Sequence, residues 1–174
     1  MKTILFYGDS NTYGFDPRGW FSERYDRPWP MILQASLDTW NILSDGLNGR
    51  TVPDDLTWVK RDLEQDIDIF AVMLGTNDIY CGYSLEKILD RMKKLCTYAK
   101  KHAHVLLMTP PAMMFEQERM AELNTMYQQL ADEMELSFLD TSQWEIDLAY
   151  DGVHFSEKGH EQFAQYMQAY LETI

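Results

Sequence analysis

The sequence predicts an α/β protein whose parallel sheet lies between helices on both faces. Two observations support this prediction. Short apolar runs alternate along the chain with amphipathic segments of helical spacing, which is the pattern of a parallel sheet. Each apolar run also ends in a glycine-rich or polar break, as strands do in open α/β sheets. We therefore expect a flavodoxin-like three-layer sandwich of about five parallel strands in the order 2-1-3-4-5, with residues 1–174 forming one domain.

The first half of the chain is expected to supply three strands and two helices. Pro28 and Pro30 suit the opening of a helix, because proline is tolerated in a first helical turn. The third apolar run is almost continuous, which predicts a central strand buried on both faces. The expected elements, in order, are a strand at residues 4–7, an aromatic loop at 13–29, a helix from 28–30 to about 38, a strand at 40–44, a helix at 53–65 and a strand at 67–74.

The second half is expected to add two strands and three helices. Ser84 and Ser156 stand where they can cap two of these helices. His160 falls on the apolar side of the last helix, which favours a hydrogen-bonded core histidine. The expected elements, in order, are a helix with an apolar stripe from 85 to 99, a strand at 104–108 stopped by two prolines, a helix around 123–134, a strand at 136–139 and a helix after 156.

Composition and charge exclude several classes of function. The net charge of −13 argues against nucleic acid or an anionic membrane as the main partner. No run approaches the roughly 20 apolar residues of a membrane span, so stable membrane insertion is not expected. The N-terminal apolar run is too short for a signal peptide, which predicts a cytoplasmic location. Cys81 and Cys96 lie in no metal-ligand or redox spacing, and no metal ion or cofactor is expected.

The residues at the predicted strand ends are those that acyl transfer requires. Ser10 follows the first strand, and a serine hydroxyl becomes a good nucleophile only when a base removes its proton. Asp151 and His154 stand three residues apart before the last helix, so the carboxylate can hold one ring nitrogen while the other faces Ser10. The backbone N–H groups of Ser10 and Gly49 and the side-chain amide of Asn77 are candidate donors to the developing oxyanion.

These segments resemble the SGNH hydrolases, also called GDSL-type esterases. Four blocks match that family in order, namely Gly8-Asp9-Ser10, Gly49, Gly75-Thr76-Asn77-Asp78 and Asp151-Gly152-Val153-His154. The sequence of residues 46–51 is most similar to the short bacterial arylesterase and acyl-hydrolase branch of the family. The resemblance implies that Ser10 is the nucleophile and His154 the base oriented by Asp151, with Ser10, Gly49 and Asn77 forming the oxyanion hole.

The expected substrate is a small ester, such as an acylated sugar, an aryl ester or a lipid. A short acyl group is favoured because no large lid is inserted. Aromatic side chains crowd the loop at 13–29, where they suit a substrate pocket, packing onto the domain or a homodimer interface equally well. Arg50 suits either an anionic substrate group or a structural salt bridge. The candidate substrate-contacting residues are Asp9, Asn11, Trp20, Arg50, Asp78 and Val153.

Two other functions are compatible with the same sequence. The segment at 10–14 resembles the phosphate loop of a flavin-binding module, although Asp9 would then bring a negative charge beside the phosphate. That function would also leave Asp151 and His154 without a role. A metal-dependent hydrolase would instead use Asp9, Asp78 and His154 as ligands of a divalent cation.

Overall fold

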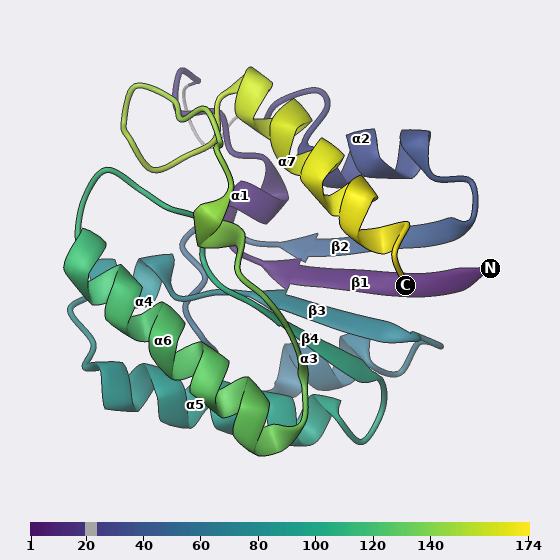
Figure 1. The fold of residues 1–174 in the computed structure, drawn as a ribbon, viewed down its shortest axis with the longest axis vertical. Helices are drawn as coiled ribbons and strands as arrows, with labels where there is room; N and C mark the ends of the chain where they lie inside the picture. Colours follow the sequence, from purple (N-terminus) through teal and green to yellow (C-terminus); the bar gives the residue numbers. More distant parts are fainter. Residues whose placement is uncertain (20–23) are drawn as a thin grey trace.

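A parallel sheet of five strands forms the middle layer of the molecule (Figure 1). The computed structural model of the chain describes residues 1–19 and 24–174. The strand order is β2-β1-β3-β4-β5, which confirms the predicted topology. The strands are β1 (Lys2–Gly8), β2 (Trp40–Gly46), β3 (Ile69–Met73), β4 (His104–Met108) and β5 (Ser137–Leu139).

Helices cover both faces of this sheet, as expected. One face carries α2 (Trp29–Ser36) and α7 (Glu157–Leu171), and the other carries α3 (Thr57–Asp62), α5 (Leu85–Ala99) and α6 (Gln117–Met134) (Figure 1). Three shorter helices follow strands, namely α1 (Ser10–Tyr13), α4 (Thr76–Tyr80) and the 3₁₀ helix η1 (Thr141–Gln143). Among the described residues, no helix is both long and apolar enough to cross a lipid bilayer.

A separate hydrophobic cluster lies on each face of the sheet. On the α5 and α6 face, the stripe of α5 packs against residues of α6, and Met92 and Leu95 are completely buried. On the α2 and α7 face, the Trp29 ring lies 4.7 Å from Phe6 and 4.8 Å from Phe163. Fully burying one such side chain stabilises the fold by about 1.5–3 kcal/mol. All five residues of β3 are buried, which confirms that it is a central strand.

The register of the sheet brings the strand ends to one level. Gly8 pairs with Gly46 on one side and with Met73 on the other. Met73 in turn pairs with Met108, and Met108 pairs with Leu139. Because the strands are parallel, the segments that leave them emerge together at one edge. This is the edge at the left of Figure 1, where the strand arrows end.

Two differences from the predicted elements have local causes. The helix expected at 53–65 is only α3, because the Asp55 carboxylate accepts hydrogen bonds from the N–H and hydroxyl of Thr57 and so starts the helix there. The helices α1 and α4 lie where the sequence indicates only polar breaks after strands. Each is a single polar helical turn without apolar periodicity, so no hydrophobic pattern predicts it.

His160 joins α7 to the start of α2. Its Nδ1 accepts a hydrogen bond of 3.2 Å from the Trp29 N–H, and the residue is only 1% exposed. Burial lowers the pKa of His160 to about 4, so the ring is neutral near pH 7. The structure therefore confirms a core histidine at this position and not a second base.

We expect Gly46→Ala to destabilise the edge of the sheet that carries Ser10. A Cβ atom at position 46 would lie 2.2 Å from the backbone nitrogen of Tyr13 and 2.6 Å from the carbonyl carbon of Thr12. Because these are backbone atoms of α1, the whole turn would have to move. The free energy of unfolding should fall by about 1–3 kcal/mol, as measured by urea unfolding followed by circular dichroism.

Gly82→Ala is the matched control for this prediction. A Cβ atom at position 82 meets nothing within 4 Å, although the backbone φ is +71°. That variant should therefore cost only the penalty of a left-handed conformation, about 1–2 kcal/mol. A smaller loss at Gly46 than at Gly82 would contradict the steric argument.

Candidate active site

Ser10 begins α1 directly after the end of β1. The Asp9 carboxylate accepts a hydrogen bond of 3.0 Å from the N–H of Asn11 and so caps this short helix. The helix ends at Gly14, whose φ of 90° favours glycine. These two features confine Ser10 to a tight strand-to-helix turn. The residue is 8% exposed. Its backbone N–H lies in the first turn of the helix, where N–H groups have no partner within the helix.

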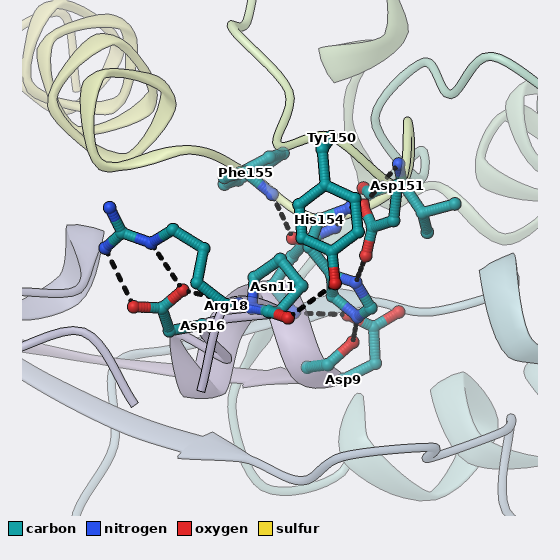
Figure 2. Close-up of polar contacts among 11 residues, drawn as sticks. Asp9, Asn11, Asp16, Arg18, Tyr150, Asp151, His154 and Phe155 are labelled. Atoms are coloured by element: carbon teal, nitrogen blue, oxygen red, sulfur yellow. Dashed lines mark hydrogen bonds and ion pairs between the residues drawn. The ribbon is translucent and has the colours of Figure 1, made fainter. Parts of the chain in front are cut away.

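The structure brings Ser10, His154 and Asp151 together (Figure 2). The Ser10 Oγ lies 2.9 Å from His154 Nε2, and His154 Nδ1 lies 2.6 Å from Asp151 Oδ2. Because an ionised carboxylate can only accept, the ring hydrogen is assigned to Nδ1. The lone pair of Nε2 then faces the serine hydroxyl, which is the arrangement that removal of its proton requires.

The loop that carries His154 folds around the Asp151 carboxylate. Oδ1 of Asp151 accepts hydrogen bonds from the backbone N–H groups of Val153 and His154, at 3.1 and 3.0 Å. Gly152, which follows Asp151 directly, has a φ of +70°, which suits glycine. Partial burial alone would raise the pKa of Asp151, but the hydrogen bonds from the imidazole and the two N–H groups lower it below its ordinary value. The carboxylate is therefore ionised when it faces the ring.

Gly49 and Asn77 meet at the ends of β2 and β3. The Nδ2 of Asn77 donates a hydrogen bond of 3.0 Å to the carbonyl of Arg50, the residue that follows Gly49. The turn around Gly49 is closed by a bond from Arg50 N–H to Leu47 O, and Leu47 N–H bonds to Gly8 O at the end of β1. A Cβ at Gly49, with its φ of +74°, would meet nothing within 4 Å. This turn therefore leaves open space over the Gly49 backbone.

Arg50 makes a structural ion pair at the end of β2. Its guanidinium donates to the carbonyl of Gly8 at 3.0 Å and to the Asp45 carboxylate at 2.9 Å. It also stacks 4.0 Å from the centre of the Tyr7 ring. These contacts support the structural interpretation of Arg50, because they occupy the guanidinium within the protein.

Asp9 and Asp78 are buried beneath the site. Burial raises the pKa of each to about 6, although the Asn11 N–H opposes the rise at Asp9 and the Val52 N–H opposes it at Asp78. The Asp78 carboxylate accepts from Val52 N–H at 3.0 Å and so holds the segment after the Gly49 turn. A carboxylate at position 9 is unfavourable beside a flavin phosphate. Within residues 1–19 and 24–174, no three His, Cys, Asp or Glu side chains are grouped as metal ligands.

The remaining candidate residues lie beside the His154 loop or outside the described chain. Nδ2 of Asn11 donates to the carbonyl of Val153 at 3.2 Å, so these two candidates contact each other. The Phe15 ring from the aromatic loop lies 4.7 Å from the His154 ring. Trp20 lies outside the described residues.

Sequence reasoning missed two residues that hold the His154 loop. The backbone N–H of Met114 donates to Gly152 O at 2.8 Å, and the hydroxyl of Tyr150 donates to Pro17 O at 2.7 Å. Both side chains are exposed, at 65% for Met114 and 79% for Tyr150. Their partners lie far away in the sequence, so no local pattern marks them.

Comparison with known proteins shows the family and the fold of the chain. Residues 6–162 match the model of the GDSL-like lipase/acylhydrolase family. The solved structure of an aryl esterase from M. smegmatis is 25% identical with a TM-score of 0.87, and the match covers 99% of each chain. A carbohydrate acetylesterase family member from Sinorhizobium meliloti is 26% identical with a TM-score of 0.85, covering 99% of this chain and 98% of the other.

A second Sinorhizobium meliloti structure, the carbohydrate acetylesterase Est24, shares the fold at 23% identity, with a TM-score of 0.85 over 99% of each chain. No curated protein sequence matches the chain. The family match extends over most of the chain and includes the segments that carry Ser10, Gly49, Asn77 and His154. The chain therefore belongs to the GDSL-like lipase/acylhydrolase family and is a serine esterase.

Proposed function

We propose that this esterase cleaves short-chain acyl esters, such as acetyl esters, through an acyl-enzyme on Ser10 with His154 as the base. The observation that carries the proposal is the 2.9 Å contact between Ser10 Oγ and His154 Nε2, with Asp151 on the other ring nitrogen. Membership of the family supports cleavage of an ester bond. A neighbour described as a carbohydrate acetylesterase family member supports a small acyl group, and one described as an aryl esterase supports ester cleavage.

The first half of the reaction forms the acyl-enzyme. The Ser10 oxygen attacks the ester carbonyl while His154 Nε2 takes the hydroxyl proton, and Asp151 stabilises the resulting imidazolium. The carbonyl electrons move onto oxygen, which accepts hydrogen bonds from Ser10 N–H, Gly49 N–H and Asn77 Nδ2. When the tetrahedral intermediate collapses, the bond to the alcohol breaks and the alcohol leaves with the proton from His154.

The second half returns the enzyme to its starting state. A water molecule gives a proton to His154 Nε2 and attacks the carbonyl of the acyl-enzyme. The same N–H donors hold the second oxyanion. The bond to Ser10 then breaks, and the proton on His154 returns to the serine oxygen while the acid is released.

The lengths of the connections around Ser10 support a short acyl group. Only two residues separate the end of β3 from α4, and α1 begins two residues after β1. The turn around Gly49 is likewise closed within four residues. These three connections therefore provide little apolar wall for a long acyl chain. The longer segment between α1 and α2 contributes the Phe15 ring, 4.7 Å from the His154 ring. A panel of esters that differ in acyl length and alcohol, compared by kcat/KM, tests this choice.

Ser10→Ala should abolish ester hydrolysis while the protein stays folded. Without the hydroxyl there is no nucleophile, so we expect kcat/KM to fall by more than about 10³-fold. A fluorophosphonate probe should label wild type at Ser10, as located by mass spectrometry, and should leave the variant unlabelled. Near wild-type turnover in a folded Ser10→Ala variant would end the assignment.

The rate should fall as the pH decreases across about pH 5–8, the range in which histidine side chains change charge. A protonated imidazole has no lone pair to accept the serine proton. The lowered pKa of Asp151 keeps its carboxylate ionised in this range. Burial raises the pKa of Asp9 and of Asp78 to about 6, so these two acids also gain protons within the range and the acid limb of kcat/KM is not assigned to one group. Asp151→Asn should lower the plateau and still show an acid limb. A flat wild-type profile would exclude His154 as the base.

Asn77→Ala should lower kcat by about 10²–10³-fold, the usual cost of removing one oxyanion donor. Its effect on KM should be small, because the contact is made mainly in the transition state. Asn41→Ala is the matched control, since Asn41 lies in β2 away from the edge that carries Ser10 and has only a 3.4 Å contact to Thr3. Equal kcat values for the two variants would remove Asn77 from this role.

A further inference from the structure

The side chain of Asn11 bonds to the residues on both sides of His154. Its Nδ2 donates to the carbonyl of Val153 at 3.2 Å, and its Oδ1 accepts from the backbone N–H of Phe155 at 2.9 Å. Figure 2 shows Asn11 beside this loop, with the imidazole of His154 and with Phe155 next to it. Asn11 is only 3% exposed, and its bond to Phe155 is buried while its bond to Val153 is partly buried.

The backbone of Asn11 is itself held firmly. Its N–H donates to the Asp9 carboxylate at 3.0 Å, and its carbonyl accepts from Trp29 Nε1 at 3.1 Å. The Trp29 ring is completely buried between Phe6 and Phe163. Asn11 is therefore fixed to the end of β1 and to the core beneath α2, and its side chain can act as a rigid support.

We propose that Asn11 is a positioning residue whose amide sets the distance between His154 and Ser10. This inference rests on the proposed function, in which His154 is the base. Asn11 is adjacent in sequence to Ser10, and Val153 and Phe155 are adjacent to His154. Two hydrogen bonds therefore join the neighbour of the nucleophile to both neighbours of the base, and the 2.9 Å contact between Oγ and Nε2 closes the ring.

This position requires an amide side chain. The loop offers one carbonyl and one N–H group, so its partner must present one donor and one acceptor side by side, as the Nδ2 and Oδ1 atoms on the Cγ of an amide do. A carboxylate of the same size would accept from Phe155 but would face the carbonyl of Val153 without a donor. A hydroxyl can reach only one of the two groups. With both amide atoms engaged, Asn11 has an internal role in place of the substrate contact expected from its sequence position.

Loss of the amide should affect proton transfer more than ester binding. A displacement of a reacting group by about 1 Å costs about 10²-fold in rate. The oxyanion donors at Gly49 and Asn77 are held by other contacts and should keep their positions. Asn11→Ala should therefore lower kcat by about 10–10²-fold with KM changed by less than about threefold.

A double-mutant cycle with His154→Ala separates positioning from other roles. The measurement is kcat/KM for an activated aryl ester, with circular dichroism and thermal unfolding to confirm folding. In the His154→Ala background, Asn11→Ala should lower the residual rate by less than about twofold, because no base remains to be misplaced. Asn77→Ala should still lower the residual rate in that background. Asn41→Ala serves as the matched amide control and should be silent in both backgrounds.

Asn11→Asp provides a second variant in case Asn11→Ala does not fold. It keeps the shape and the acceptor towards Phe155 but lacks the donor to Val153, and the same cycle applies to it. Equal losses in the wild-type and His154→Ala backgrounds, or a loss confined to KM, would overturn the positioning role. Wild-type activity in His154→Ala would instead refute the proposed function itself, and the role of Asn11 would fall with it.

Discussion

Parallel pairing of β1 with β2 and β3 is the constraint on which the site depends. Hydrogen bonding fixes the register of these strands so that Gly8 lies level with Gly46 and Met73. The turns that follow must then emerge side by side, whatever their sequences. Ser10, Gly49 and Asn77 therefore stand at the same edge of the sheet, because each lies shortly beyond one of three adjacent strand ends. Bonds from Asn77 and Leu47 to the neighbouring segments refine this arrangement.

His154 reaches the site by a different route, because it does not stand directly beyond a strand end but in the long segment between η1 and α7. Its loop is built around Asp151 and is attached to the rest of the protein through Asn11, Met114 and Tyr150. Each attachment uses backbone or side-chain hydrogen bonds, which have strict geometry but contribute only about 0.5–1.5 kcal/mol each to stability. The proposed oxyanion donors thus belong to the sheet edge, whereas the position of His154, the proposed base, depends on a few directional contacts.

The buried carboxylates of Asp9 and Asp78 are held near the site at a cost in free energy. Burial raises the pKa of Asp9 and Asp78 to about 6, so near pH 7 the fold maintains two carboxylates in surroundings that penalise their charge. Each carboxylate accepts a hydrogen bond from a backbone N–H of a segment next to the site. The donor is Asn11 for Asp9 and Val52 for Asp78. Such groups are tolerated at functional sites because they fix the backbone that carries the reacting groups.

The sequence by itself predicted the alternation of strands and helices, the central strand β3 and the grouping of polar breaks at one edge, because hydrophobic periodicity is local. The strand order was predicted from the arrangement that such alternation adopts in doubly wound sheets. The sequence also identified Ser10, Asp151 and His154 as candidates. It overextended α3 and missed α1 and α4, whose single turns carry no apolar pattern. Only the tertiary structure decided that Asn11 and Arg50 have internal partners, since those partners are separated from them in the chain and meet only after the sheet and the His154 loop have assembled.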